Sequence, residues 1–203
     1  MEKACTIESG EDKAWRELGE ADPREVETNS GAGYIESKNV YRLEILGGVY
    51  EVSASERRIT CISEPGRKPE YFISLTAPIY LVQAKPILPS GELVKEVAGG
   101  GFFFRGSHTL PLDAIAGKYG ADRDSFLRAA ACVGGVSMPG GDAAFAFHAY
   151  PRIGMAFMLW LADEEFEARA GLLFDSNAHR HMALDALWAV ALTACQRMLA
   201  FTS

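Results

Sequence analysis

A run of three consecutive acidic residues in the last quarter of the sequence could supply acid–base chemistry through its carboxylates. Asp163, Glu164 and Glu165 follow the apolar run 153–161. Two carboxylates held about 5 to 9 Å apart can act as general acid and general base when an apolar pocket raises the pKa of one. Adjacent acids in a turn diverge, so a solvated hairpin loop anchored by Phe166 is the alternative interpretation.

Two histidines, His179 and His181, are the second group suited to chemistry. On a strand their side chains would share one face and could bind a metal ion together, whereas on a helix about 200° would separate them. A third ligand would have to come from Asp175, His148 or another acidic residue. One prediction is therefore a metal- or carboxylate-dependent enzyme that uses His179, His181, Asp175 and the acids at 163–165. Surface or capping histidines before the last helix are the other interpretation.

Charged residues at the ends of the predicted C-terminal strands form a third candidate, a surface for a ligand or a partner. Loops at strand ends commonly carry function. The candidate binding residues are Asp142, Arg152, Asp163, Glu164 and Asp175. Each also has a structural interpretation, in which Asp175 caps the turn that follows it and Arg152 pairs with Glu165.

Several common site motifs are absent from the sequence. Gly31-Ala32-Gly33 begins like a dinucleotide fingerprint, but Glu36 stands at the third glycine position and a predicted helix precedes it. The three glycines at 99–101 have no Gly-Lys-Ser/Thr after them, which excludes a P-loop and favours a turn into the aromatic run 102–104. Neither a Gly-x-Ser-x-Gly elbow nor a His-Glu-x-x-His sequence occurs.

The four cysteines are isolated along the chain. Zinc ribbons, iron–sulfur binding sequences and thioredoxin-like motifs need closely spaced cysteines, and no Cys-x-x-Cys pair is present. We therefore assign no cofactor and expect free thiols in a reducing cytoplasm. The cysteines are Cys5, Cys61, Cys132 and Cys195.

Composition and charge exclude other classes. The 203 residues are 48% hydrophobic and 23% charged, as in an ordinary folded domain. With 20 basic and 27 acidic residues the net charge is −7, so we predict no binding to nucleic acid or to an anionic membrane surface. The charged N-terminus is unlike a secretory signal, and no apolar run approaches the eighteen or so residues of a membrane span.

Local patterns predict the N-terminal elements. Trp15 and Leu18 lie on one face of a charged helix, and Asp22 followed by Pro23 begins a second helix that ends near Gly31. Residues 40–45 alternate as in a half-buried strand, and Gly47-Gly48 predicts a tight turn into a partner strand over 49–52. Residues 59–62 would add a third strand.

The remaining elements follow from similar patterns. Residues 71–83 are apolar all round and contain Pro78, so a kinked buried helix and an irregular strand both remain open, and we favour the helix. Asp113 and Asp122 are predicted helix caps, 143–149 and 153–161 read as paired strands, and 184–201 has helical spacing. These elements predict one α+β domain over 1–203, with a helical segment at 1–32, a main body at 33–203, a mainly antiparallel sheet, flanking helices and a long C-terminal helix.

The C-terminal block resembles a bacterial and archaeal family of domains of unknown function. The residues that carry the resemblance are Gly141-Asp142, Phe145, Phe147, Tyr150-Pro151-Arg152, Leu159-Trp160, Asp163-Glu164-Glu165-Phe166, Leu173-Phe174-Asp175 and Ala178. Weaker similarity extends over nearly the whole chain. Members of that family occur mostly in anaerobes, and some are fused to small iron–sulfur modules like those of corrinoid and one-carbon proteins.

The resemblance implies an accessory role beside an iron–sulfur or corrinoid protein, and it supplies no catalytic residue. This chain lacks the cluster-binding cysteines, so a cluster would belong to a partner. It also has His181-Met182-Ala183-Leu184 where relatives look more like Tyr-Leu-Pro-Thr. We therefore expect a cytoplasmic binding or accessory module first and the enzyme second, with dimerisation through the apolar C-terminal helix as a third interpretation.

Overall fold

The structure is a computed structural model that describes residues 9–100 and 106–202. The order of helices and strands confirms the α+β class, with two antiparallel sheets and a long C-terminal helix. Cys5 lies outside the described residues. The predicted turn at 99–101 lies partly outside them, and the aromatic run 102–104 lies wholly outside them. Within them, no helix is both long enough and apolar enough to cross a membrane.

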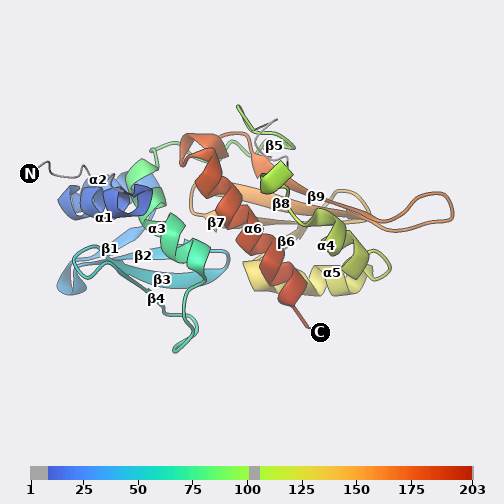
Figure 1. Cartoon of the computed structure of the whole chain (residues 1–203), viewed down its shortest axis with the longest axis horizontal. Coiled ribbons are helices and arrows are strands. Elements are labelled where there is room, and N and C mark those ends of the chain that lie inside the picture. Colours follow the sequence, from blue (N-terminus) through green and yellow to red (C-terminus); the bar gives the residue numbers. More distant parts are fainter. Residues whose placement is uncertain (1–8, 101–105, 203) are drawn as a thin grey trace, which may run out of the picture.

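The first half of the chain folds into a four-stranded sheet with three helices (Figure 1). The strands pair in chain order, each antiparallel to the next. Helix α3 packs against both N-terminal helices. The elements are α1 (Gly10–Glu20), α2 (Pro23–Ser30), β1 (Gly33–Ile35), η1 (Glu36–Lys38), β2 (Val40–Ile45), β3 (Gly48–Ser53), β4 (Arg58–Cys61) and α3 (Tyr71–Gln83).

The second half forms a five-stranded sheet in the order β5-β9-β8-β7-β6, and the long helix α6 lies across it (Figure 1). Helices α4 and α5 contact the same sheet through β9 and β7. The elements are β5 (Leu93–Val94), η2 (Gly106–His108), α4 (Leu112–Tyr119), α5 (Arg123–Ala129), η3 (Ala130–Val133), β6 (Val136–Met138), β7 (Ala143–Tyr150), β8 (Ile153–Trp160), β9 (Arg169–Asp175), η4 (Ala178–Arg180) and α6 (Leu184–Ala200).

Several local predictions are confirmed. Asp22 caps α2, with its carboxylate accepting hydrogen bonds from the next backbone N–H groups, and Gly31 ends that helix in the left-handed conformation. Residues 71–83 are a helix that contains Pro78, and β7 pairs with β8 as expected. Asp122 caps α5 through the backbone N–H of Ser125.

Three local predictions were wrong. The first hairpin turns at Leu46 and Gly47, which both have positive φ, because Ile45 pairs with Gly48. Asp113 lies in the first turn of α4 and is not its cap, since Pro111 occupies the cap position. His181 is neither on the surface nor a cap of α6, because it is completely buried and Ala183 occupies the cap position; it ends the short 3-10 helix η4 that contains His179.

The two sheets meet where their backbones touch directly. Gly47 lies so close to Gly134 that a Cβ on either would come within 2.7 Å of the other's backbone. The backbone N–H of Leu46 donates to the carbonyl of Ala149, 3.3 Å away. One cluster of buried hydrophobic side chains includes residues of both sheets. These contacts join the two halves and place α6 between them.

The apolar face of α6 is buried inside the chain itself. Its fully buried residues include Leu187, Val190, Ala191, Ala194 and Cys195. The helix contacts α3, α4, η3 and β7. The face that the dimerisation interpretation required is therefore occupied by the protein's own core.

Candidate functional site

The five predicted site residues do not form one cluster, because β8 separates them. Arg152 precedes β8, whereas Asp163 and Glu164 follow it. A strand of this length spans about 26 Å at roughly 3.3 Å per residue. Asp175 lies at the Arg152 end, since its Cβ is next to Gly154. The charges do lie at strand ends, but at opposite ends of the sheet.

Asp175 is held by hydrogen bonds that fix its neighbouring loop. The two oxygens of this buried carboxylate accept from the backbone N–H groups of Ser90, Gly91 and Asn177 and from the Ser90 hydroxyl, at 2.8 to 3.0 Å. Burial alone would raise the pKa of Asp175, but these hydrogen bonds outweigh it and hold the pKa below its usual value. The predicted capping role is therefore observed.

Arg152 lies beside the C-terminal ends of α2 and α3. Its Nη2 donates to the Thr28 carbonyl at 3.1 Å, and its backbone N–H donates to the Tyr80 hydroxyl. The predicted pairing of Arg152 with Glu165 was wrong, because the two residues lie at opposite ends of β8. Its buried Nε has no hydrogen-bond partner within the described residues.

The acids at the other end of β8 shape turns. Asp142 accepts from the backbone N–H of Leu161 at 2.8 Å. Asp163 accepts from the backbone N–H groups of Glu165 and Phe166, and these bonds lower its pKa. Both Asp163 and its exposed neighbour Glu164 lie on the loop between β8 and β9. This is the solvated hairpin loop of the alternative interpretation, but Phe166 does not anchor it, because its side chain is exposed.

His181 is completely buried next to Arg152 and Arg180. Its Nδ1 accepts from the backbone N–H of Lys85 at 3.4 Å, while its Nε2 is buried without a partner in the described part of the chain. Burial, followed by those two guanidinium charges, lowers the pKa of His181 to about 4. Among residues 9–100 and 106–202, no group of three or more His, Cys, Asp or Glu residues could hold a metal ion.

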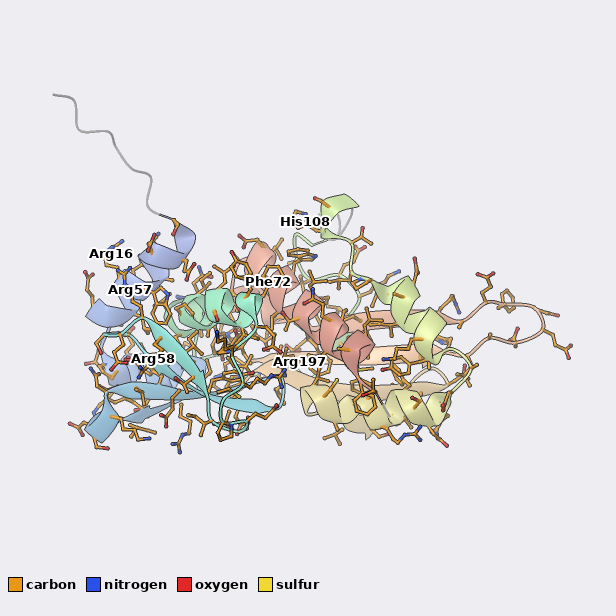
Figure 2. The ribbon with its side chains drawn as sticks, turned by 60° about the horizontal axis from the view of Figure 1, so that its bottom comes forward. Arg16, Arg57, Arg58, Phe72, His108 and Arg197 are labelled. Carbon is orange, nitrogen blue, oxygen red and sulfur yellow. The ribbon has the colours of Figure 1, made fainter. Side chains whose placement is uncertain are left out.

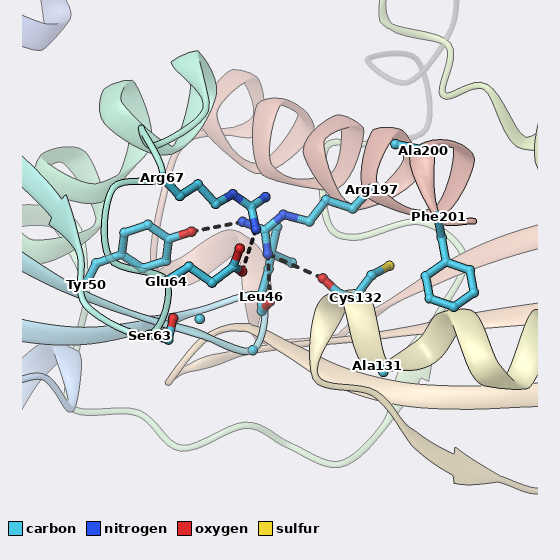
Figure 3. A pocket seen from close by; sticks show the side chains of 12 residues that line it. Leu46, Tyr50, Ser63, Glu64, Arg67, Ala131, Cys132, Arg197, Ala200 and Phe201 are labelled. Carbon is cyan, nitrogen blue, oxygen red and sulfur yellow. Dashed lines mark hydrogen bonds and ion pairs between the residues drawn. The ribbon is translucent and has the colours of Figure 1, made fainter. Parts of the chain in front are cut away.

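A polar pocket of about 370 Å³ lies at the junction of the two sheets, and we call it the seam pocket (Figure 3). Arg197 of α6 reaches into it with a side chain only 9% exposed. Its Nε and Nη2 bind the two carboxylate oxygens of Glu70 at 2.9 and 3.1 Å. Nη2 also donates to the Tyr50 hydroxyl at 2.9 Å, and Nη1 donates to the carbonyls of Leu46 at 2.8 Å and Cys132 at 3.4 Å.

These contacts use all five N–H donors of the guanidinium group. Burial opposes the charge of Arg197, but the hydrogen bonds to Glu70 hold its pKa above the usual value. Burial raises the pKa of the Cys132 thiol, so that thiol is a poor nucleophile at neutral pH. The seam pocket is therefore a structural junction whose polar groups already have partners.

A second pocket of about 410 Å³ has a different lining, and we call it the aromatic pocket. Leu75 and Ile79 of α3 add aliphatic surface. It is defined by the rings of Tyr71, Phe72, His108 and Trp188 and by the carboxylates of Glu11 and Asp185.

Trp188 of α6 joins the rings of the aromatic pocket. Its ring meets Phe72 edge to face at a centroid distance of 5.8 Å and His108 at 5.1 Å. Tyr71 meets Phe72 at 5.4 Å and is 71% exposed. The labelled side chains of Phe72 and His108 lie on α3 and η2 (Figure 2). The buried Nε1 of Trp188 has no hydrogen-bond partner within the described residues.

The sequence interpretation missed the aromatic pocket entirely. Its residues come from four segments, near 11, 71, 108 and 185. No spacing rule connects positions that distant. The one local signal is the pair of large rings, Tyr71-Phe72, at the start of an apolar helix. The structure then shows that Tyr71 is exposed, which is less common for a large ring.

Comparison with known proteins gives a family and no further relative. No curated protein and no solved structure matches the chain. The family described as "Domain of unknown function (DUF3786)" matches residues 22–197, which include most of the described elements. This chain therefore belongs to the DUF3786 family.

Proposed function

We propose that this domain is a binding module that holds a small ligand in the aromatic pocket. The observation that carries the proposal is a pocket of about 410 Å³ walled by rings from α3, η2 and α6. Ligand sites are typically concave, mostly apolar and about 300 to 1,000 Å³ in volume, with a few polar groups. The seam pocket fits this description less well, because its polar groups bind one another.

Replacing Tyr71 with alanine is expected to weaken ligand binding by about three- to tenfold, because one aromatic wall is lost. Suitable probes are choline and its neutral isostere 3,3-dimethylbutan-1-ol, which together sample cationic and neutral ligands. Dissociation constants come from backbone amide chemical-shift titrations of the full chain. Tyr71 is 71% exposed, so the Tyr71→Ala variant should fold normally.

The matched control is Phe166→Ala, which removes another exposed ring, 66% accessible, from the β8–β9 loop. The control should bind both probes as the unmodified chain does. If neither probe shifts any amide at millimolar concentrations, or if the two variants behave alike, the aromatic pocket is not the binding site.

The accessory role beside an iron–sulfur or corrinoid protein remains a further proposal. It rests only on the resemblance noted in the sequence, which implies that some relatives carry iron–sulfur modules. The enzyme alternative has less support, because its residues lie at both ends of β8. Anaerobic purification of the tagged chain from its own cells should enrich such a partner in proportion to the bait, and its absence from repeated purifications would remove the proposal.

A further inference from the structure

The charged side chains that the structure describes around the aromatic pocket are all acidic. Glu11 lies in the first turn of α1 and Asp185 in the first turn of α6. Among the lining residues that the structure describes, these are the only Asp, Glu, Lys or Arg side chains. Asp185 accepts a hydrogen bond from the backbone N–H of Ala186 through Oδ1. Within the described residues, the pocket therefore presents two carboxylates and no guanidinium or ammonium group.

Like the two carboxylates, the rings of the pocket favour a positively charged ligand. The face of an aromatic ring carries partial negative charge and attracts cations, most strongly in tryptophan. Trp188 contacts the rings of Phe72 and His108 edge to face, an arrangement that keeps ring faces from stacking on one another. Aromatic walls beside carboxylates are the combination that recognises quaternary ammonium and other organic cations.

We propose that the ligand of the aromatic pocket is an organic cation, a quaternary ammonium ion or a protonated amine with a short apolar body. The cationic head would lie against the pocket-facing surfaces of Tyr71, Phe72 and Trp188, near Glu11 and Asp185. This inference rests on the proposed function and adds the chemical class of the ligand. The N-termini of α1 and α6 offset only part of the charge of the two carboxylates, so an anion would still be repelled, and a neutral apolar ligand would gain nothing from them.

The test compares choline with 3,3-dimethylbutan-1-ol, which has the same shape but carries no charge. In the unmodified full chain, choline should bind about tenfold more tightly, because exposed cation–π contacts and exposed ion pairs each change affinity only a few-fold. Added salt should weaken the binding of choline and leave that of the alcohol unchanged. The double variant Glu11→Gln, Asp185→Asn should bind choline less tightly and the alcohol as before.

The control is Glu164→Gln, which neutralises an exposed acid on the β8–β9 loop and should leave the preference for choline intact. Equal affinity for the two probes, or tighter binding of the alcohol, would overturn the cation inference while the binding module stands. A preference that persists in the double variant would also overturn the role of the carboxylates. Failure of both probes to bind would instead refute the proposed function.

Discussion

Replacing Arg197 with methionine is expected to lower the free energy of unfolding by about 2 to 4 kcal/mol, because the hydrogen bonds of a guanidinium group that is only 9% exposed are lost. The variant leaves the carbonyls of Leu46 and Cys132 without this donor, and it leaves Glu70 with Arg67, 2.7 Å away, as its ion-pair partner. It also removes the hydrogen bonds that link α6 to β3 through Tyr50 and to η3 through Cys132. Urea unfolding followed by circular dichroism measures the change.

Arg128→Met is the matched control, because the Arg128 side chain is 55% exposed and lies 4.0 Å from Asp122. Its effect should stay within about 0.5 kcal/mol, as for most exposed pairs. The double variant Glu70→Gln, Arg197→Met should be less destabilised than the sum of its single changes. If Arg197→Met lowers the free energy of unfolding by less than about 1 kcal/mol, the junction at the seam pocket does not depend on the hydrogen bonds of Arg197.

Acidification is expected to destabilise the protein through His181. The pKa of this histidine is about 4 in the folded chain and 6.5 when unperturbed. Between these values the unfolded chain binds the proton and the folded chain does not, so the free energy of unfolding falls as the pH falls. From pH 7 to pH 5 the contribution of His181 is about 2 kcal/mol. Arg152, Arg180, His179 and Asp175 are the ionisable groups that act on it.

The variant His181→Asn removes the titrating ring and keeps an acceptor where Nδ1 receives the Lys85 N–H. We expect its stability to vary less with pH than that of the unmodified chain, even if its stability at pH 7 is lower. His148→Asn, at an exposed position of β7, should leave the pH dependence unchanged. Parallel pH profiles for the unmodified chain and His181→Asn would contradict the burial of a neutral imidazole.

Most elements could be predicted from the sequence because their signals are local. The Asp22-Pro23 cap, the alternation over 40–45 and the helical spacing after 184 each depend on neighbouring residues. Strand β9 was missed because Arg169 and Gly171 interrupt its apolar run. It is held in place by pairing with β8 along its whole length.

The first hairpin shows how distant contacts override a local pattern. Two glycines predicted the turn at 47–48, but the turn includes Leu46, a residue that seldom adopts positive φ. Leu46 is only 1% exposed, its N–H donates to the carbonyl of Ala149, and its own carbonyl accepts from Arg197. Those partners lie about a hundred or more positions after Leu46 in the chain. A rule that considers only the residues of the turn does not include them.

The candidate sites were harder to predict than the fold. Charged residues do bracket the strand ends as predicted, but sequence alone does not say that Arg152 and Asp163 occupy opposite ends of one strand. The aromatic pocket depends on α1, α3, η2 and α6 meeting in space. Its rings and acids look ordinary in their own segments, and the packing of α1 and α6 against α3 brings most of them together.

The most direct test of the binding site follows the indole N–H resonances of Trp188 and Trp160 in the full chain while choline is added. Trp188 lines the aromatic pocket, whereas Trp160 lies at the far end of β8 beside Arg169. We expect the Trp188 resonance to shift and reach saturation while the Trp160 resonance keeps its position. A Trp188 resonance that stays fixed while other signals report choline binding would contradict the account.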